Sequence, residues 1–135
     1  MTVSFRVFPE SKQPYWFEVL VFSTTGALSK HLSSRHKISR GERFRGITIL
    51  DGVDTDRKLG EICFHRRCLS SHLIAHEALH AAISYSQRAK GVEAIHFTQE
   101  GWVDRHEERL ASIMEKIVKS INRQIENKCS KEKAK

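Results

Sequence analysis

Two histidines and a glutamate lie within five residues of one another, in the stretch His76-Glu77-Ala78-Leu79-His80. In an α-helix, side chains four residues apart lie one turn above each other, so His76 and His80 could direct both imidazoles at one point. Zinc suits such a pair best, because hydrolytic zinc sites combine three protein ligands with one water. Glu77 lies about 100° round the helix from His76, where it could act as a general base on that water.

The residues around this motif are apolar and rich in alanine, without proline or glycine, which predicts a largely buried helix. They are Leu73, Ile74, Ala75, Ala78, Leu79, Ala81, Ala82 and Ile83. Two histidines and a glutamate are costly to bury on such a helix without partners, and this cost favours a metal site. A pair of hydrogen-bonded core histidines is the alternative interpretation.

The motif resembles the active-site helix of the zincin metallopeptidases. In that family the glutamate takes a proton from water held by zinc, the water attacks a peptide carbonyl, and the glutamate passes the proton to the leaving amine. The resemblance therefore implies that Glu77 is the catalytic base and that His76 and His80 bind Zn²⁺. No third histidine of the H-x-x-G-x-x-H kind follows His80, which argues against a metzincin. Compact, lone-domain zincins are similar to proteins of phages and mobile elements.

A third zinc ligand is expected near the start of the last helix, since gluzincin-like families place a glutamate on a second helix downstream. An apolar stripe identifies the inner face of that helix: Leu110, Ile113, Met114, Ile117, Val118, Ile121 and Ile125. At 100° per residue, Glu107 falls near the centre of the stripe, whereas Glu108 points away from it. We predict Glu107 as the ligand, with Glu108 and His106 as alternates. A capping box with Asp104, or an exposed first-turn position, would also explain Glu107.

Other groups are not singled out by their spacing. Tyr85, His96 and His106 are available to stabilise an oxyanion. His72 lies four residues before His76 and shares its face, so it could orient that ligand or simply bond to backbone.

The pattern of the whole chain predicts an α+β fold, with a small, mostly antiparallel sheet of about four strands packed against three helices. The motif lies on the second helix. Strands are expected at residues 3–8 and 15–22, forming one hairpin, and at 44–50 and 59–66, forming another. Helices are expected from Thr24 or Thr25 to His36, from Ser70 or Ser71 to about Lys90, and after residue 104. Residues 1–127 would form a single zincin-like domain, followed by a basic, disordered tail at 128–135.

The strand that precedes the active-site helix commonly borders the cleft in zincins and pairs with extended substrate. By resemblance, Ile62, Cys63, Phe64 and His65 would bind substrate, because a sheet edge offers unpaired backbone groups.

Composition excludes two broad classes of protein. With 39% hydrophobic and 29% charged residues, the 135-residue chain matches neither a disordered chain nor a membrane protein. No apolar run approaches the roughly 20 residues of a membrane span, and the N-terminus lacks a signal-peptide layout, so we expect a cytoplasmic protein. Its three cysteines are then expected to be free thiols.

The net charge of +7 is partly concentrated in one segment, where six cations are opposed by a single Glu42. They are Lys30, Arg35, Lys37, Arg40, Arg43 and Arg45. This segment could bind nucleic acid, but it lacks a known binding motif, which favours a solvated face. The sequence therefore predicts a zinc metallopeptidase that acts on a protein or peptide. A nucleic-acid-associated module and a catalytically inactive zinc-binding module are the alternatives.

Overall fold

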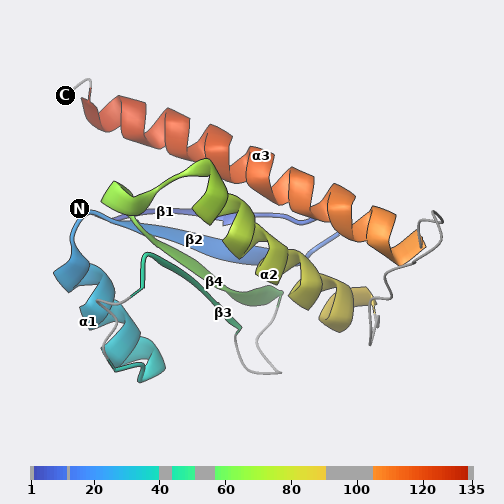
Figure 1. The fold of residues 1–135 in the computed structure, drawn as a ribbon, viewed down its shortest axis with the longest axis horizontal. Coiled ribbons are helices and arrows are strands. Elements are labelled where there is room, and N and C mark those ends of the chain that lie inside the picture. The colour runs from blue at the N-terminus through green and yellow to red at the C-terminus, as the bar shows by residue number, and fades with distance from the viewer. Residues whose placement is uncertain (1, 12, 40–43, 51–56, 91–104, 134–135) are drawn as a thin grey trace.

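The protein is a four-stranded mixed sheet with helices on both faces, as the computed structural model in Figure 1 shows. The structure describes residues 2–11, 13–39, 44–50, 57–90 and 105–133, and it describes the backbone alone for 89–90, 105–107 and 129–133. In chain order, the elements are β1 (Val3–Val7), β2 (Trp16–Phe22), α1 (Thr25–His36), β3 (Gly46–Leu50), β4 (Lys58–His65), a short 3₁₀ helix (Arg66–Cys68), α2 (Ser71–Lys90) and α3 (Arg105–Lys133). The predicted α+β class, with a small sheet packed against three helices, is confirmed.

The strand order is β1-β2-β4-β3, so β4 is internal and β3 lies at an edge. Strands β1 and β2 pair antiparallel, as do β3 and β4, which confirms both predicted hairpins. The two hairpins join through a parallel pairing of β2 with β4. This arrangement follows from the crossover through α1, because parallel neighbours need a long connection between them.

Helices α2 and α3 cover one face of the sheet and enclose the larger core. The sheet contributes mostly valine and phenylalanine side chains, whereas α2 contributes small ones that let it lie close to the strands. The buried α2 residues in this core are Ile74, Ala78, Ala81, Ala82 and Tyr85. The side of α2 away from this core is therefore left to form a surface.

Helix α1 covers the opposite face of the sheet, where Leu28 and Leu32 pack on Leu20, Phe22 and Cys63. The helix begins as predicted, since the hydroxyl of Thr24 accepts a hydrogen bond from the N–H of Ala27 at 3.0 Å. It ends at Lys37, which adopts a left-handed conformation with φ of 56°.

Helix α3 carries the predicted apolar stripe, with Leu110, Ile113, Ile117 and Ile121 buried. Neither α3 nor any other helix in the described ranges combines the length and apolarity needed to cross a membrane. The helix continues to Lys133, so residues 128–133 are helical and not part of the disordered tail that the sequence predicts for 128–135. Lysine and glutamate, which are common in residues 128–133, are good helix formers. The ammonium of Lys128 also donates a hydrogen bond to the backbone oxygen of Ser4 at 3.2 Å.

Candidate metal and catalytic site

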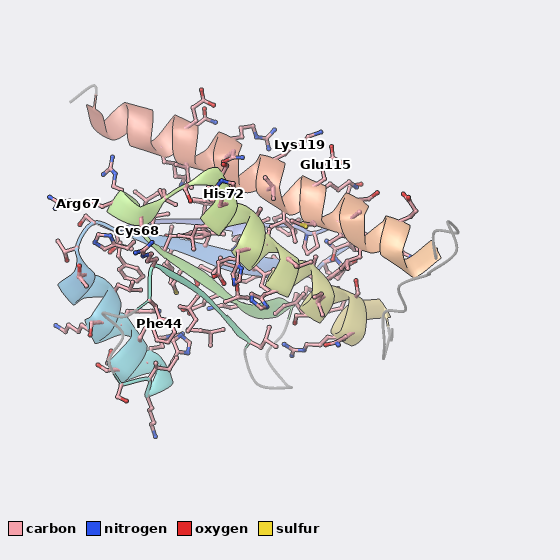
Figure 2. The ribbon with its side chains drawn as sticks, viewed as in Figure 1. Phe44, Arg67, Cys68, His72, Glu115 and Lys119 are labelled. Carbon is pink, nitrogen blue, oxygen red and sulfur yellow. The ribbon has the colours of Figure 1, made fainter. Side chains whose placement is uncertain are left out.

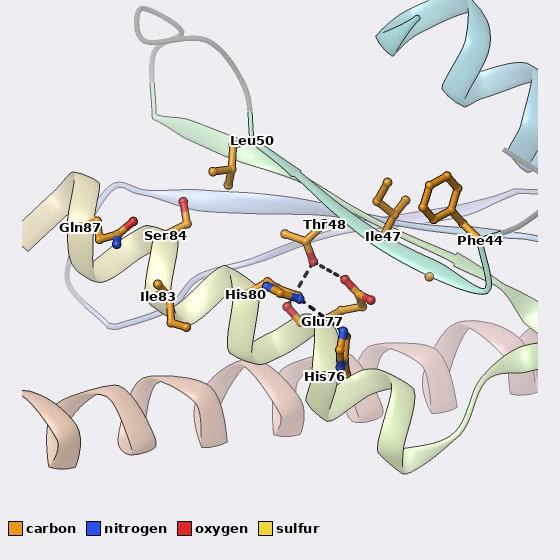
Figure 3. Close-up of a pocket in the computed structure, with 11 residues that line it drawn as sticks. Phe44, Ile47, Thr48, Leu50, His76, Glu77, His80, Ile83, Ser84 and Gln87 are labelled. Atoms are coloured by element: carbon orange, nitrogen blue, oxygen red, sulfur yellow. Dashed lines mark hydrogen bonds between the residues drawn. The ribbon is translucent and has the colours of Figure 1, made fainter. Parts of the chain in front are cut away.

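The imidazoles of His76 and His80 meet on one face of α2 (Figure 3). Their Nε2 atoms are 3.3 Å apart, and their rings are inclined at 75° with centroids separated by 4.9 Å. Two nitrogens that each lie about 2.0–2.1 Å from a tetrahedral zinc ion are themselves about 3.3 Å apart. The pair therefore has the spacing of two adjacent ligands of one zinc ion.

Both histidines are exposed, which differs from the expectation of a largely buried motif. The alanines and Tyr85 of α2 lie on the opposite side and face the sheet and α3. The cost of burial therefore gives no support to a metal at the histidines themselves. It applies instead to Glu77, whose side chain is only 4% exposed.

The carboxylate of Glu77 is fixed by the neighbouring strand β3. The hydroxyl of Thr48 lies 2.8 Å from Oε1 of Glu77 and 3.2 Å from the backbone oxygen of the same residue, and it donates toward both. This contact places the carboxylate between α2 and β3, in the pocket that both imidazoles also line (Figure 3). A general base requires such a restrained position beside the reacting atoms.

A pocket of about 470 Å³ lies between α2 and β3 and includes the side chains of His76, Glu77 and His80. On the β3 side it is lined by Thr48 and Leu50, among others. A second hollow of about 480 Å³ shares His76 and Glu77 with the first. Its other walls include Phe44, Cys68 and His72, which are labelled in Figure 2. The motif thus borders a groove that continues in both directions along α2.

The strand that borders this groove is β3, and the prediction that residues 62–65 form the substrate edge is wrong. Those residues, Ile62, Cys63, Phe64 and His65, are buried in β4, which pairs with β2 on one side and β3 on the other. Their backbone groups are engaged in the sheet. The strand immediately before the motif helix is internal because β3 takes the outer position.

The outward-facing groups of β3 follow from its register with β4. The N–H of His65 donates to the oxygen of Arg45 at 3.0 Å, so Arg45 faces β4. In an antiparallel pair, successive residues alternate between facing the partner and facing away. Gly46, Thr48 and Leu50 therefore direct their backbone N–H and C=O groups to the open edge, beside the groove.

The first described side chains of α3 contact the core and the loop after β1. Leu110 is in the core, and the guanidinium of Arg109 is 3.5 Å from a carboxylate oxygen of Glu10, which also accepts a 2.7 Å hydrogen bond from Tyr85. Tyr85 is nine residues after His76, which places it halfway round the helix. Its phenol is thus held away from the pair, and burial together with the bond to Glu10 raises its pKa above the usual range.

The structure does not bring Glu108 to the histidine pair. Glu108 is exposed, and within the described side chains His76 and His80 belong to no group of three or more donors lying within 4.8 Å of one another. The side chains of Glu107 and His106 lie outside the described part of the chain, so Glu107 stays a prediction. His96 and Asp104 lie outside it as well.

A second group of metal-ligating side chains lies on the other face of the sheet. His31 and His36 of α1 and Glu61 of β4 have donor atoms within 4.8 Å of one another, and the group could hold a metal ion. Sequence reasoning missed it. The available signal was Glu61 itself, because a carboxylate within a buried strand requires partners.

The basic segment of residues 30–45 is only partly described. Lys30, Arg35, Lys37 and Arg45 are exposed, whereas Arg40 and Arg43 lie outside the described residues. One of these cations has an internal partner, since Nε of Arg35 is 3.7 Å from Glu61.

Comparisons with models of protein families, with curated proteins and with solved structures found no match.

Proposed function

We propose that the protein is a zinc-dependent metallopeptidase whose metal is held by His76 and His80. The observation that carries this proposal is the 3.3 Å separation of the two Nε2 atoms, which matches two ligands of one tetrahedral ion. Glu107 is the proposed third protein ligand. When bound, zinc supplies Lewis acidity that makes water nucleophilic near neutral pH and polarises a peptide carbonyl.

Glu77 is the proposed general base. It takes a proton from the attacking water and delivers it to the nitrogen of the leaving amine as the peptide bond breaks. The hydroxyl of Thr48 holds one carboxylate oxygen at 2.8 Å, which leaves the second oxygen for the reacting water. Thr48 is thus a positioning residue, since it acts through Glu77.

The proposed substrate is an extended peptide segment that pairs with the open edge of β3. The outward backbone groups of Gly46, Thr48 and Leu50 can each form two hydrogen bonds with such a segment. Because Thr48 contacts Glu77, a strand added at this edge would run beside the proposed base. Residues 62–65 have no part in this mode of binding.

The test compares variants of the full chain on a library of internally quenched peptides in the presence of Zn²⁺. Glu77→Gln should lower kcat/KM by at least about 100-fold while binding as much zinc as the wild type. His76→Ala and His80→Ala should each lose the equivalent of zinc that is bound at α2, and both should lose cleavage. Glu115→Gln, which removes an exposed carboxylate of α3 that pairs with Lys119, is the matched control and should behave as the wild type.

Equal cleavage by the wild type and Glu77→Gln would contradict the assignment of the base. Zinc that is lost in the histidine variants, without cleavage of any peptide by the wild type, would identify a catalytically inactive zinc-binding module. A zinc content that is the same in the wild type and in both histidine variants would reject the metal site at α2.

A further inference from the structure

A cluster of His31, His36 and Glu61 lies between α1 and the sheet, on the face opposite to α2. Nε2 of His31 is 2.7 Å and Nε2 of His36 is 2.9 Å from the same oxygen, Oε1 of Glu61. The side chain of Glu61 is only 2% exposed to solvent, whereas those of His31 and His36 are 20% and 12% exposed. The carboxylate is therefore buried, while the imidazoles remain within reach of solvent.

The two oxygens of Glu61 have different partners. Oε1 faces the two histidines, whereas Oε2 accepts a hydrogen bond from Lys58 at 3.2 Å and lies 3.7 Å from Arg35. Burial alone would raise the pKa of Glu61, but hydrogen bonds from His31, His36 and Lys58 lower it to about 2. The carboxylate is thus an anion at neutral pH, with one oxygen held by a cation and the other directed at two imidazoles.

We propose that His31, His36 and Glu61 form a binding site for a divalent transition metal ion such as Zn²⁺. Two imidazoles and one carboxylate are a donor set that zinc accepts, with water as the fourth ligand. Lys58 limits Glu61 to one-oxygen ligation and orients it, as hydrogen-bonded partners of metal ligands commonly do. The partial exposure of both histidines leaves a side from which the ion and its water can enter.

The charge and proton balance of binding is simple. Each Nε2 now faces Oε1 at hydrogen-bond distance, and the ion takes the place of the Nε2 protons. A histidine that is neutral before binding keeps its single proton, which then lies on Nδ1. A histidine that is protonated before binding releases its Nε2 proton to solvent and keeps the proton on Nδ1. The ion replaces two hydrogen bonds with three metal-ligand bonds, and it joins the second half of α1 to strand β4.

The experiment uses the full chain, stripped with a chelator, desalted and titrated calorimetrically with Zn²⁺. His76→Ala/His80→Ala removes the pair on α2, and His31→Asn/His36→Asn removes the imidazoles of the cluster. We expect one equivalent of zinc to remain in the α2 variant and to disappear when both pairs are replaced. Co²⁺ added to the α2 variant should give the visible absorption of a low-coordinate nitrogen and oxygen site.

Two further variants keep the test decisive. Glu61→Gln preserves side-chain volume and should lower zinc affinity of the α2 variant by at least about 10-fold, even if the double asparagine variant fails to fold. Ser33→Ala, an exposed change on the same helix, should leave binding unchanged.

Absence of bound zinc in the folded α2 variant would overturn the proposal and would leave the cluster as a hydrogen-bonded clamp between α1 and β4. Zinc binding that survives Glu61→Gln at full affinity would overturn it too. Because the α2 pair is absent from these variants, either failure is distinct from a failure of the proposed peptidase activity.

Discussion

Replacement of Glu61 by glutamine should destabilise the metal-free protein by an amount that depends on pH. Hydrogen bonds from His31, His36 and Lys58 outweigh the burial that opposes ionisation and lower the pKa of Glu61 from 4.5 to about 2. Since one pKa unit corresponds to 1.36 kcal/mol, ionised Glu61 contributes about 3 kcal/mol to the free energy of unfolding at pH 7. Its side chain is only 2% exposed, so solvent screening takes little of this contribution away.

The direction of the effect follows from the lowered pKa. Stability from Glu61 is fully present above pH 4.5, where the unfolded chain is also ionised, and it is lost as the pH falls toward 2. At pH 3, about 1 kcal/mol of the contribution of Glu61 to the free energy of unfolding remains. The difference between wild type and Glu61→Gln should therefore shrink by about 2 kcal/mol between pH 7 and pH 3.

Urea unfolding of both proteins at the two pH values, with a chelator present, measures this difference. Glu108→Gln removes an exposed carboxylate and is the control, with an expected change below about 0.5 kcal/mol at either pH. If the free energy of unfolding of the wild type exceeds that of Glu61→Gln by the same amount at pH 7 and pH 3, the assigned role of the cluster is refuted.

Three other substitutions test the site and the strand beside it. Gly60→Ala should destabilise the protein by about 1–3 kcal/mol in urea, because the added methyl group collides with the backbone of β3, whereas Gly26→Ala meets open space and should not. Thr48→Val should lower kcat/KM about 10-fold or more with zinc content unchanged, since it removes a hydrogen bond to a buried carboxylate; an unaltered rate would dismiss the positioning role. Glu107→Gln should weaken zinc binding by more than about 10-fold and Glu108→Gln should not, as equilibrium dialysis can measure; the reverse order would reject Glu107 as the ligand.

Local features of the fold could be predicted because short-range geometry determines them. Thr24 caps α1, and α2 runs from Ser71 to Lys90, both close to the predicted positions. The approach of His76 to His80 also depends only on helix geometry, since side chains four residues apart share a face.

The order of the strands could not be predicted in this way. Residues 58–65 of β4 form a run buried on both faces, which is typical of an internal strand, whereas β3 contains Gly46, Thr48 and the exposed Leu50. The position of β4 directly before the motif helix nevertheless favours β4 as the substrate edge. Only the parallel pairing of β2 with β4 places β3 outside, and that pairing joins segments about 40 residues apart.

The cluster around Glu61 could not be predicted from the sequence either, because its residues come from two separate elements, α1 and β4. His31 and His36 are separated by five residues, a spacing that does not place two side chains on one helix face. The two rings meet because α1 packs on the face of the sheet that carries Glu61, so both Nε2 atoms reach Oε1 of that residue.

Glu61 and Glu77, the buried glutamates of the described residues, differ in a way that separates their proposed roles. Glu61 is surrounded by Lys58, His31 and His36, and such donors stabilise the anion so strongly that it is a poor proton acceptor near neutral pH. In the described structure the side-chain hydrogen bond of the Glu77 carboxylate comes from the uncharged hydroxyl of Thr48, and Glu77 lines both hollows beside α2. An anion that must accept and then release a proton requires access and mild stabilisation, whereas one that holds a cation requires a fixed negative charge. The proposed proton acceptor, Glu77, lies on the α2 face of the sheet, and the proposed metal ligand, Glu61, lies on the α1 face.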